Sequence, residues 1–125
     1  MQTSANLQSP IRFLESFDLD AQDFRAYESW WWEPGIDMSA TVDRAGTPCL
    51  RMFDRQGNRV DEVVFPASYR EILHRGYREG IVARPFESNS LIDSYLLTYV
   101  TSFFDPGLSC PYIVSLSTAL PLAKY

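Results

Sequence analysis

The sequence predicts a mainly α-helical domain with one β-hairpin. Three observations lead to this fold class: an apolar helical periodicity over residues 89–104, a turn sequence between two β-prone segments over residues 49–65, and helix-start signals at Ser9-Pro10 and at Pro66. With 125 residues, 46% of them hydrophobic and 22% charged, the chain can bury one core without metals or disulfides. We therefore expect a single domain of ordinary size.

Charge and cysteine content exclude several classes of partner. A net charge of −5 leaves no excess of Lys and Arg for a nucleic-acid backbone. Cys49 and Cys110 are not at a metal-ligand spacing and are predicted to be buried free thiols in a reducing cytosol, although one disulfide is arithmetically possible. The chain shows no signal-peptide pattern and no apolar run of membrane-spanning length. We expect a cytoplasmic protein that binds neither nucleic acid nor a membrane.

The first 41 residues are expected to form an N-terminal extension with short helices, beginning with a loose tail over residues 1–8. Ser9 as N-cap and Pro10 at the first helical position predict a helix of one or two turns. A second helix is expected from Asp20 to Trp32, stopped by Glu33-Pro34-Gly35. Its buried face carries Ala21, Phe24, Tyr27 and Trp31. The segment that follows is mixed and contains a predicted loop at residues 46–48.

The three consecutive tryptophans Trp30, Trp31 and Trp32 have two interpretations. They could form a stacking platform for a ring-bearing ligand, or an apolar plug over the core or over a partner chain. Consecutive helical residues point about 100° apart, so the three cannot share one face and at least one is left facing outward. The plug or partner interface is the favoured interpretation.

A β-hairpin is predicted from Cys49 to Phe65, with a turn that begins at Asp54 and has Gly57 where a positive φ is needed. Asp61 and Glu62 could be considered as an acid–base pair. Adjacent strand residues face opposite ways, however, which argues against joint catalysis.

Pro66 opens a helix that runs through Glu79 and ends at Gly80 as the C′ residue. Gly76 lies within its buried stripe and suggests close approach by a neighbouring element. That stripe contains Tyr69, Ile72, Leu73, Gly76 and Tyr77. A loop with Pro85 is expected to follow over residues 81–88.

The polar side of this helix contains the single histidine, His74, and several arginines. A general base or a phosphate site could be built from them. Because Glu71, Glu79 and Glu87 alternate with the arginines, a solvated charged face is favoured, with His74 half-exposed on it. The arginines concerned are Arg70, Arg75, Arg78 and Arg84.

The central helix, residues 89–104, is the most apolar segment and is predicted to be sandwiched between neighbours, with Asp93 as its single ionised group. Its expected buried face, widened by Leu97, comprises Leu91, Ile92, Tyr95, Leu96, Tyr99, Val100, Phe103 and Phe104. It should end at Asp105-Pro106-Gly107. A further start signal at Ser109-Cys110-Pro111 predicts an apolar helix over residues 112–124, interrupted near Pro121. Such an apolar terminus is what a truncated or separately encoded piece of a larger assembly would show.

From Val42 onward, the order of features resembles the N-terminal part of the AidB-like acyl-CoA dehydrogenases, a family of flavoproteins. The marks of this resemblance are Gly46-Thr47-Pro48, the hairpin with its Asp-x-x-Gly turn, and Asp105-Pro106-Gly107-Leu108-Ser109-Cys110-Pro111 before the last helix. It covers residues 42–125, about two-thirds of the chain, and is not carried by residues 1–41.

The resemblance implies a helical domain that packs beside a β-domain and a helical bundle. Full-length members bind FAD and take hydrogens from an acyl thioester, a carboxylate removing the α proton while flavin N5 accepts the β hydride. The family's flavin-binding segments and catalytic carboxylate lie downstream of this sequence, so no catalytic or cofactor residue is assigned here, and FAD is expected on a partner chain or a downstream domain. The last helix would lie nearest the substrate cleft, with Ser115, Ser117 and Thr118 facing it. Alternatively, these three are small residues that let helices pack closely.

Two main hypotheses follow for the function. The first is an N-terminal domain or small subunit of an FAD-dependent acyl-CoA dehydrogenase-like oxidoreductase, forming one wall of the acyl cleft and inactive without a larger chain. The second is a non-catalytic interaction module derived from that fold, and a third, weaker one is a stand-alone domain that binds an acyl chain between its helices. The expected partner interface comprises Trp30, Trp31, Trp32, Leu116, Leu120 and Leu122.

Overall fold

The computed structural model describes residues 9–125, apart from the side chain of residue 45. The tail predicted for residues 1–8 lies outside the described residues. The elements are α1 (Pro10–Glu15), the 3₁₀ turn η2 (Gln22–Phe24), α2 (Arg25–Trp30), the π turn η3 (Trp31–Gly35), α3 (Ile36–Ala45), β1 (Cys49–Phe53), β2 (Arg59–Val64), α4 (Ala67–Arg78), α5 (Arg84–Glu87), α6 (Leu91–Phe104) and α7 (Pro106–Lys124). The predicted fold class, mainly α with one hairpin, is confirmed.

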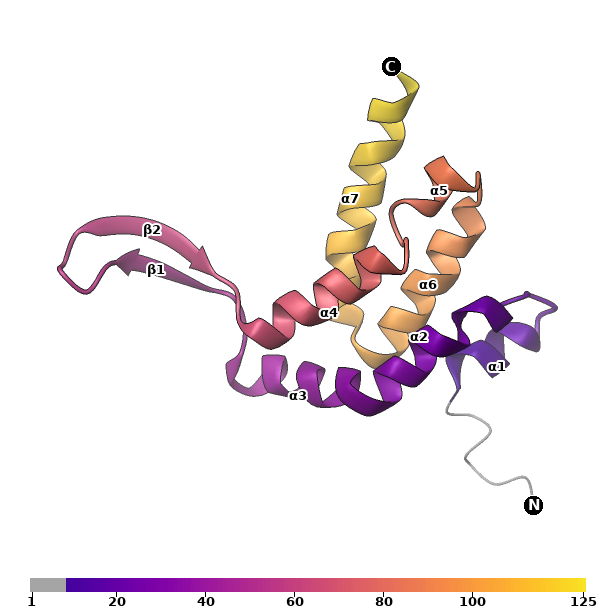
Figure 1. Cartoon of the computed structure of the whole chain (residues 1–125), viewed down its shortest axis with the longest axis horizontal. Coiled ribbons are helices and arrows are strands. Elements are labelled where there is room, and N and C mark those ends of the chain that lie inside the picture. Colours follow the sequence, from indigo (N-terminus) through magenta and orange to yellow (C-terminus); the bar gives the residue numbers. More distant parts are fainter. Residues whose placement is uncertain (1–8) are drawn as a thin grey trace.

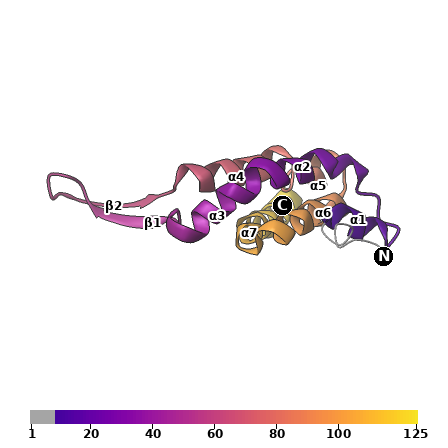
Figure 2. The same ribbon diagram turned by 90° about the horizontal axis from the view of Figure 1, so that it is seen from below.

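The helices are arranged in two layers, and the hairpin extends away from both (Figures 1 and 2). The view in Figure 2 places α2 and α4 in one layer and α1, α6 and α7 in the other. One continuous core lies between them. Its fully buried members are Ile11, Ala21, Tyr27, Trp31, Ile72, Ile81, Leu97, Val100 and Tyr112.

The start of α1 and the buried face of α2 are as predicted. The Arg12 backbone N–H donates to Ser9 Oγ at 3.2 Å, which satisfies one of the free amides at the helix start. Ala21, Phe24, Tyr27 and Trp31 are all buried.

The predicted helix stop at residues 33–35 is wrong. The chain instead passes through the π turn η3 and continues directly into α3, where a mixed segment was expected. Pro34 has no N–H to give to the carbonyl four residues earlier, and the wider turn restores pairing because the Ile36 N–H donates to the Trp31 carbonyl. Gly35 allows this turn, since a Cβ there would lie 2.7 Å from the Trp31 ring. The loop at residues 46–48 is confirmed.

The hairpin is confirmed, with antiparallel pairs that include Cys49 with Val64 and Arg51 with Glu62. The latter two side chains also form an ion pair. A bulge lies between the Arg51 and Phe53 pairs, where Asp61 has a φ of 45°. Gly57 has the expected positive φ, 85°.

The turn is held by the exposed carboxylate of Asp54, which accepts hydrogen bonds from the Asn58 side-chain amide (2.9 Å) and from the backbone N–H groups of Asn58 and Gln56 (2.8 Å each). These bonds hold the pKa of Asp54 below its ordinary value, the Asn58 side chain being the largest cause.

Acidification is therefore expected to loosen this turn. The ionised carboxylate is favoured by folding, so its stabilisation is complete above the ordinary carboxyl pKa and is lost as the pH falls through the lowered native pKa of Asp54. The chemical shift of the residue-58 backbone amide, followed by NMR against pH, reports the ionisation of Asp54. Its titration midpoint in the chain should lie at a lower pH than in a peptide that spans the turn. Asn58→Ala should raise that midpoint toward the peptide value. Equal midpoints in the chain and the peptide would contradict the hydrogen-bonding role.

Helix α4 has the predicted bounds to within a residue, with Gly80 just beyond its end at a φ of 86°. Tyr77 of the expected buried stripe is, however, exposed. Gly76 is in close contact with Tyr112 of α7, as its position in the stripe suggested. The Tyr112 hydroxyl donates to the backbone carbonyls of Ile72 (3.0 Å) and Leu73 (3.1 Å). Part of the expected loop at residues 81–88 is the short helix α5.

Helix α6 begins two residues later than predicted, and its expected buried face is confirmed only in part, at Leu96, Leu97 and Val100. Ser94, Leu97 and Thr101 are fully buried, while Ile92, Tyr95 and Phe103 of the expected face are exposed. The two buried threonine hydroxyls are satisfied locally, because Thr98 Oγ1 donates to the Ser94 carbonyl and Thr101 Oγ1 to the Leu97 carbonyl. The buried Ser94 hydroxyl has no hydrogen-bond partner among the described residues. Thr101 Oγ1 also lies 2.9 Å from the Tyr27 hydroxyl.

The predicted start of the last helix at Pro111 is also wrong, as is its interruption near Pro121. Helix α7 begins at Pro106 and runs through both prolines to Lys124. Its N-cap is Asp105, whose carboxylate accepts from the Leu108 N–H (3.1 Å) and from Ser39 Oγ of α3 (2.6 Å). This double role ties the end of α6 to α3 and starts α7 five residues earlier than expected.

Both cysteines are free, but they are exposed and not buried as predicted. Cys49 lies at the base of the exposed hairpin and Cys110 on the outer side of α7. Among the described helices, none is both long and apolar enough to cross a membrane.

Candidate functional site

The open face of α7 is the first part of the candidate site. Lys124 is the single charged residue of this helix, and much of its second half projects beyond α4 and α6 (Figure 1). Val114 is 60% exposed and Leu122 72% exposed. Spaced at about 100° per residue, the exposed positions form one continuous side of the helix. They are Cys110, Ile113, Val114, Ser117, Thr118, Pro121, Leu122 and, in the last turn, Lys124.

The three hydroxyl residues expected at the cleft are not brought together. Ser117 and Thr118 lie on the open face of α7. Thr118 Oγ1 donates to the Val114 carbonyl at 2.9 Å, which is a bond within the helix. Ser115 is half-buried at the edge of that face, 2.8 Å from the Tyr77 hydroxyl of α4. Ser117 and Thr118 are therefore the hydroxyls available to a molecule lying against α7.

The expected partner interface is reduced by burial. Trp31 is fully buried and Leu116 is 5% exposed. Both side chains are already covered by this chain and are not available to a partner. The Trp31 ring is parallel to that of Phe104, with the ring centroids 5.4 Å apart. Leu120 is half-buried, whereas Leu122 is exposed.

The other two tryptophans point elsewhere, as the spacing of consecutive helical residues requires. Trp30 is half-buried, and the guanidinium of Arg75 lies 5.4 Å from its ring centre. Trp32 is 42% exposed and meets Phe103 and Phe104 edge-on. Of the three, Trp32 presents the largest apolar surface to a partner.

A second exposed apolar strip runs along α6 and was missed by the sequence analysis, which placed it in the core. It is formed by the exposed Ile92, Tyr95 and Phe103 and the half-buried Tyr99, which recur at three- and four-residue spacing. Phe13 of α1 stacks on Tyr99 with 6.1 Å between ring centroids. Because this helix has large apolar residues on more than one side and small hydroxyl residues on its covered side, its pattern does not distinguish the covered side from the open one.

The charged side of α4 is neutralised by ion pairs. Arg75 pairs with Glu79 and Arg78 with Glu71. Arg84 lies 3.5 Å from Asp93 of α6. His74 is exposed. This arrangement agrees with the solvated face expected from the sequence, since three of the four arginines that could have held a phosphate are occupied by carboxylates. The fourth, Arg70, is exposed and forms no ion pair among the described residues.

Burial governs the ionisable groups near the α4–α7 contact. It raises the pKa of Tyr112 far above the ordinary phenol value and also raises that of Tyr69. The Tyr112 hydroxyl thus remains a hydrogen-bond donor at any physiological pH. Among the described residues there is no group of three His, Cys, Asp or Glu side chains placed to hold a metal ion.

Comparison with known families decides the relationship. A family model described as the adaptive response protein AidB N-terminal domain matches residues 14–124. The chain belongs to this family. The resemblance found in the sequence is therefore confirmed, and the match to the AidB N-terminal domain also includes most of the first 41 residues, which the sequence motifs had left outside it. The curated proteins and the solved structures gave no match.

Membership explains the combination of elements that the structure shows. An AidB N-terminal domain is an acyl-CoA dehydrogenase-like N-terminal region, so its mainly helical body with one hairpin is the fold expected for this part of the family. Domains of this family are the N-terminal part of a larger kind of protein. The described residues leave two apolar surfaces exposed, one on α6 and one on α7.

Proposed function

We propose that this chain is the N-terminal domain or a small subunit of an FAD-dependent acyl-CoA dehydrogenase-like oxidoreductase, and that α7 forms one wall of the acyl-substrate cleft. The observation that carries the proposal is the open face of α7. A helix surface left in water normally carries charge along its length, whereas this face is apolar with two hydroxyls, Ser117 and Thr118, and has a single charge, Lys124, in the last turn. Such a surface suits an acyl chain, which needs apolar contact and few polar groups.

The described residues do not fit FAD by themselves. A flavin dinucleotide needs a cradle for its pyrophosphate, made of free cations or of backbone amides at a glycine-rich helix start. Arg75, Arg78 and Arg84 are paired with carboxylates. The arginines that form no ion pair among the described residues, Arg44, Arg55 and Arg70, lie around the hairpin, and none is at a glycine-rich helix start. The two glycines with positive φ, Gly57 and Gly80, lie in the hairpin turn and at the end of α4. We therefore place FAD and the catalytic carboxylate on a larger chain or domain and derive no step through them here.

A second candidate is a non-catalytic interaction module that keeps the fold. The observation that favours it is the α6 strip, a row of apolar residues along one side of a helix and separate from the open face of α7. Such a row is typical of a surface that packs against another helix. In this case a protein partner would cover Ile92, Tyr95 and Phe103, and no acyl compound would be needed.

Co-expression with a candidate FAD-bearing acyl-CoA dehydrogenase-like chain tests the proposal. We expect a complex that carries flavin absorbance and whose flavin is bleached by a saturated acyl-CoA under anaerobic conditions. Val114→Asp, on the open face of α7, should raise the acyl-CoA concentration needed for half-bleaching by about tenfold or more, because a carboxylate enters an apolar contact.

Ile92→Asp is the matched variant, since it places the same charge at an equally exposed apolar site on α6. It should leave the acyl-CoA dependence unchanged if α7 is the cleft wall. A stable complex without flavin, disrupted by Ile92→Asp and indifferent to Val114→Asp, would instead establish the interaction module. Failure of every candidate FAD-bearing chain to bind would end the first proposal.

A further inference from the structure

The hairpin forms an arm that no other described part of this chain covers. It leaves the body between α3 and α4 and extends away from both helix layers in each view (Figures 1 and 2). All of its strand residues are exposed except Val64, which is half-buried. A two-stranded hairpin in water is marginally stable by itself and normally needs a third strand or a packed surface.

One side of the hairpin is apolar. Leu50 and Val63 are directly paired across the strands, and Met52 lies on the same side two residues along β1. Each of the three side chains is about half exposed. The other side carries the Arg51–Glu62 ion pair, so the two sides differ in chemistry.

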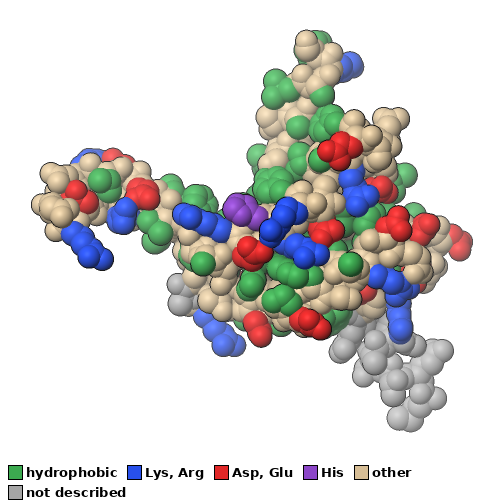
Figure 3. All heavy atoms as spheres, viewed as in Figure 1, with side chains coloured by type: hydrophobic (Ala, Val, Ile, Leu, Met, Phe, Trp, Pro, Cys, Tyr) green, Lys and Arg blue, Asp and Glu red, His purple; other side chains and the backbone are tan. Residues whose placement is uncertain are grey.

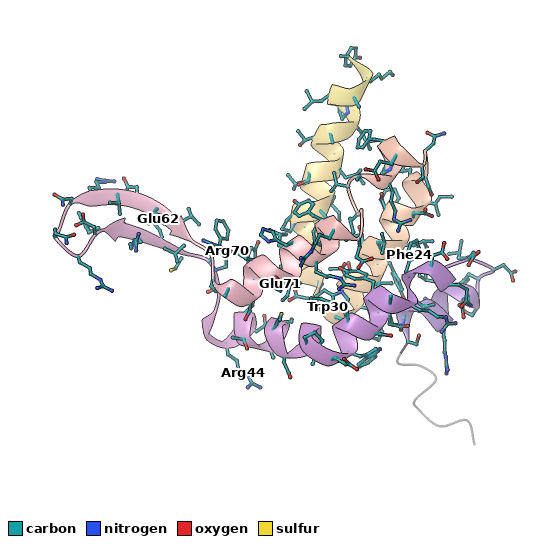
Figure 4. All side chains as sticks on the ribbon, in the orientation of Figure 1. Phe24, Trp30, Arg44, Glu62, Arg70 and Glu71 are labelled. Carbon is teal, nitrogen blue, oxygen red and sulfur yellow. The ribbon has the colours of Figure 1, made fainter. Side chains whose placement is uncertain are left out.

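Arginine side chains lie on this arm and at its base (Figure 3). Three of these arginines form no ion pair among the described residues, and Lys124, which also forms none, lies at the far end of α7. Arg55 is in the hairpin turn, Arg70 is in the first turns of α4 at the hairpin base (Figure 4), and Arg44 is in the last turn of α3. None of these three forms an ion pair among the described residues, whereas Arg25, Arg51, Arg59, Arg75, Arg78 and Arg84 each do.

The excess of negative charge lies in the N-terminal segment of the chain, before the hairpin. Residues 9–45, which form α1 to α3, contain eight acidic residues and three arginines, a net charge of −5, and residues 46–125 are balanced with eight of each sign. Within this part, the exposed apolar pair Trp32 and Ile36 is bordered by the exposed acids Glu33 and Asp37. Neither acid has an ion-pair partner among the described residues.

We propose that the hairpin docks on the Trp32–Asp37 face of a second copy of this chain. The two surfaces are complementary: an apolar strip flanked by free arginines meets an apolar pair flanked by free carboxylates. Every copy carries both surfaces, so a two-fold pair makes the contact twice. The contact lies away from the open face of α7 and holds whether or not the proposed enzymatic role is correct.

Charge reversal tests this contact. Variant A changes the arm, with Arg55→Glu and Arg70→Glu. Variant B changes the receiving face, with Glu33→Arg and Asp37→Arg. We expect the unaltered chain to dimerise in sedimentation equilibrium, and each variant by itself to show a dissociation constant raised by at least about tenfold at low salt. All four positions are exposed, and unchanged helical circular dichroism would show that both variants fold.

Mixing the two variants is the decisive measurement. The glutamates on the arm of A face the arginines of B, and the unaltered arm of B faces the unaltered acids of A, so both contacts of the mixed dimer are again complementary. We expect the mixture to recover dimers that neither variant forms by itself. A monomeric unaltered chain, a dimer indifferent to both reversals, or a mixture that stays monomeric would each overturn the proposal.

Discussion

Leu97→Asp is expected to unfold the chain at room temperature. Leu97 is fully buried on α6, in the core shared with Val100, Tyr112 and Trp31. The change removes a leucine side chain, which costs about 2–5 kcal/mol in a core, and adds a carboxylate that no described cation can reach there. A domain of this size has a stability of about 5–15 kcal/mol in total. Circular dichroism and urea titration should show a chain without a cooperative transition.

Ile92→Asp is the control on the same helix. It introduces the same charge less than two turns away, where the side chain is 64% exposed. Its free energy of unfolding should stay within about 0.5 kcal/mol of the unaltered chain. If Leu97→Asp melted cooperatively at the unaltered temperature, the position of the core on α6 would be wrong. If Ile92→Asp unfolded as well, the exposed strip on α6 would not exist in the isolated chain.

This pair of variants also marks where the sequence was ambiguous. Leu91, Ile92, Tyr95 and Phe103 have helical spacing that fits a core face, and they were assigned to it. The buried side instead includes Ser94, Thr98 and Thr101, which appear polar in the sequence. Because threonine hydroxyls can bond to carbonyls four residues earlier, such residues enter a core with little penalty, and periodicity by itself cannot reveal this.

Local chemistry was a better guide where one or two residues determine the backbone. The hairpin turn follows from Asp54 and Gly57, the start of α1 from Ser9 and Pro10, and the end of α4 from Gly80. Proline was the unreliable signal. Pro34 and Pro111 were interpreted as a stop and a start, yet both lie within helical segments held by packing of Trp31 and Tyr112. Tertiary contacts thus override a breaker that sequence rules treat as decisive.

The candidate site could be predicted in outline but not in detail. The last helix was expected to matter because the family resemblance placed it near the substrate, and its open apolar face agrees with that expectation. Which hydroxyls face outward depends on the rotation of α7, and that rotation is set by contacts the sequence does not show. Ser115 turns toward Tyr77, while Ser117 and Thr118 remain open.

Gly76→Ala is expected to destabilise the chain, against the usual effect of this change in a helix. Inside a helix, alanine is favoured over glycine by about 1 kcal/mol. At Gly76, however, a Cβ would fall far inside van der Waals contact of Tyr112 Oη and Cζ, and 3.0 Å from Ile81 Cδ1. Tyr112 would have to withdraw and give up its hydrogen bonds to the carbonyls of Ile72 and Leu73. We expect a net loss of about 1–3 kcal/mol, measured by urea or thermal unfolding.

Repeating Gly76→Ala in a chain that also carries Tyr112→Leu separates the clash with Tyr112 from other causes of destabilisation. In Tyr112→Leu the hydroxyl and the ring atom nearest to Gly76 are gone, so the added methyl group has room. There, Gly76→Ala should become neutral or stabilising by up to about 1 kcal/mol, the intrinsic helix preference of alanine. The reversal of sign between the two backgrounds is the specific consequence of α4 and α7 packing glycine against tyrosine. An equal loss in both would show that the close approach at Gly76 is not what joins these two helices.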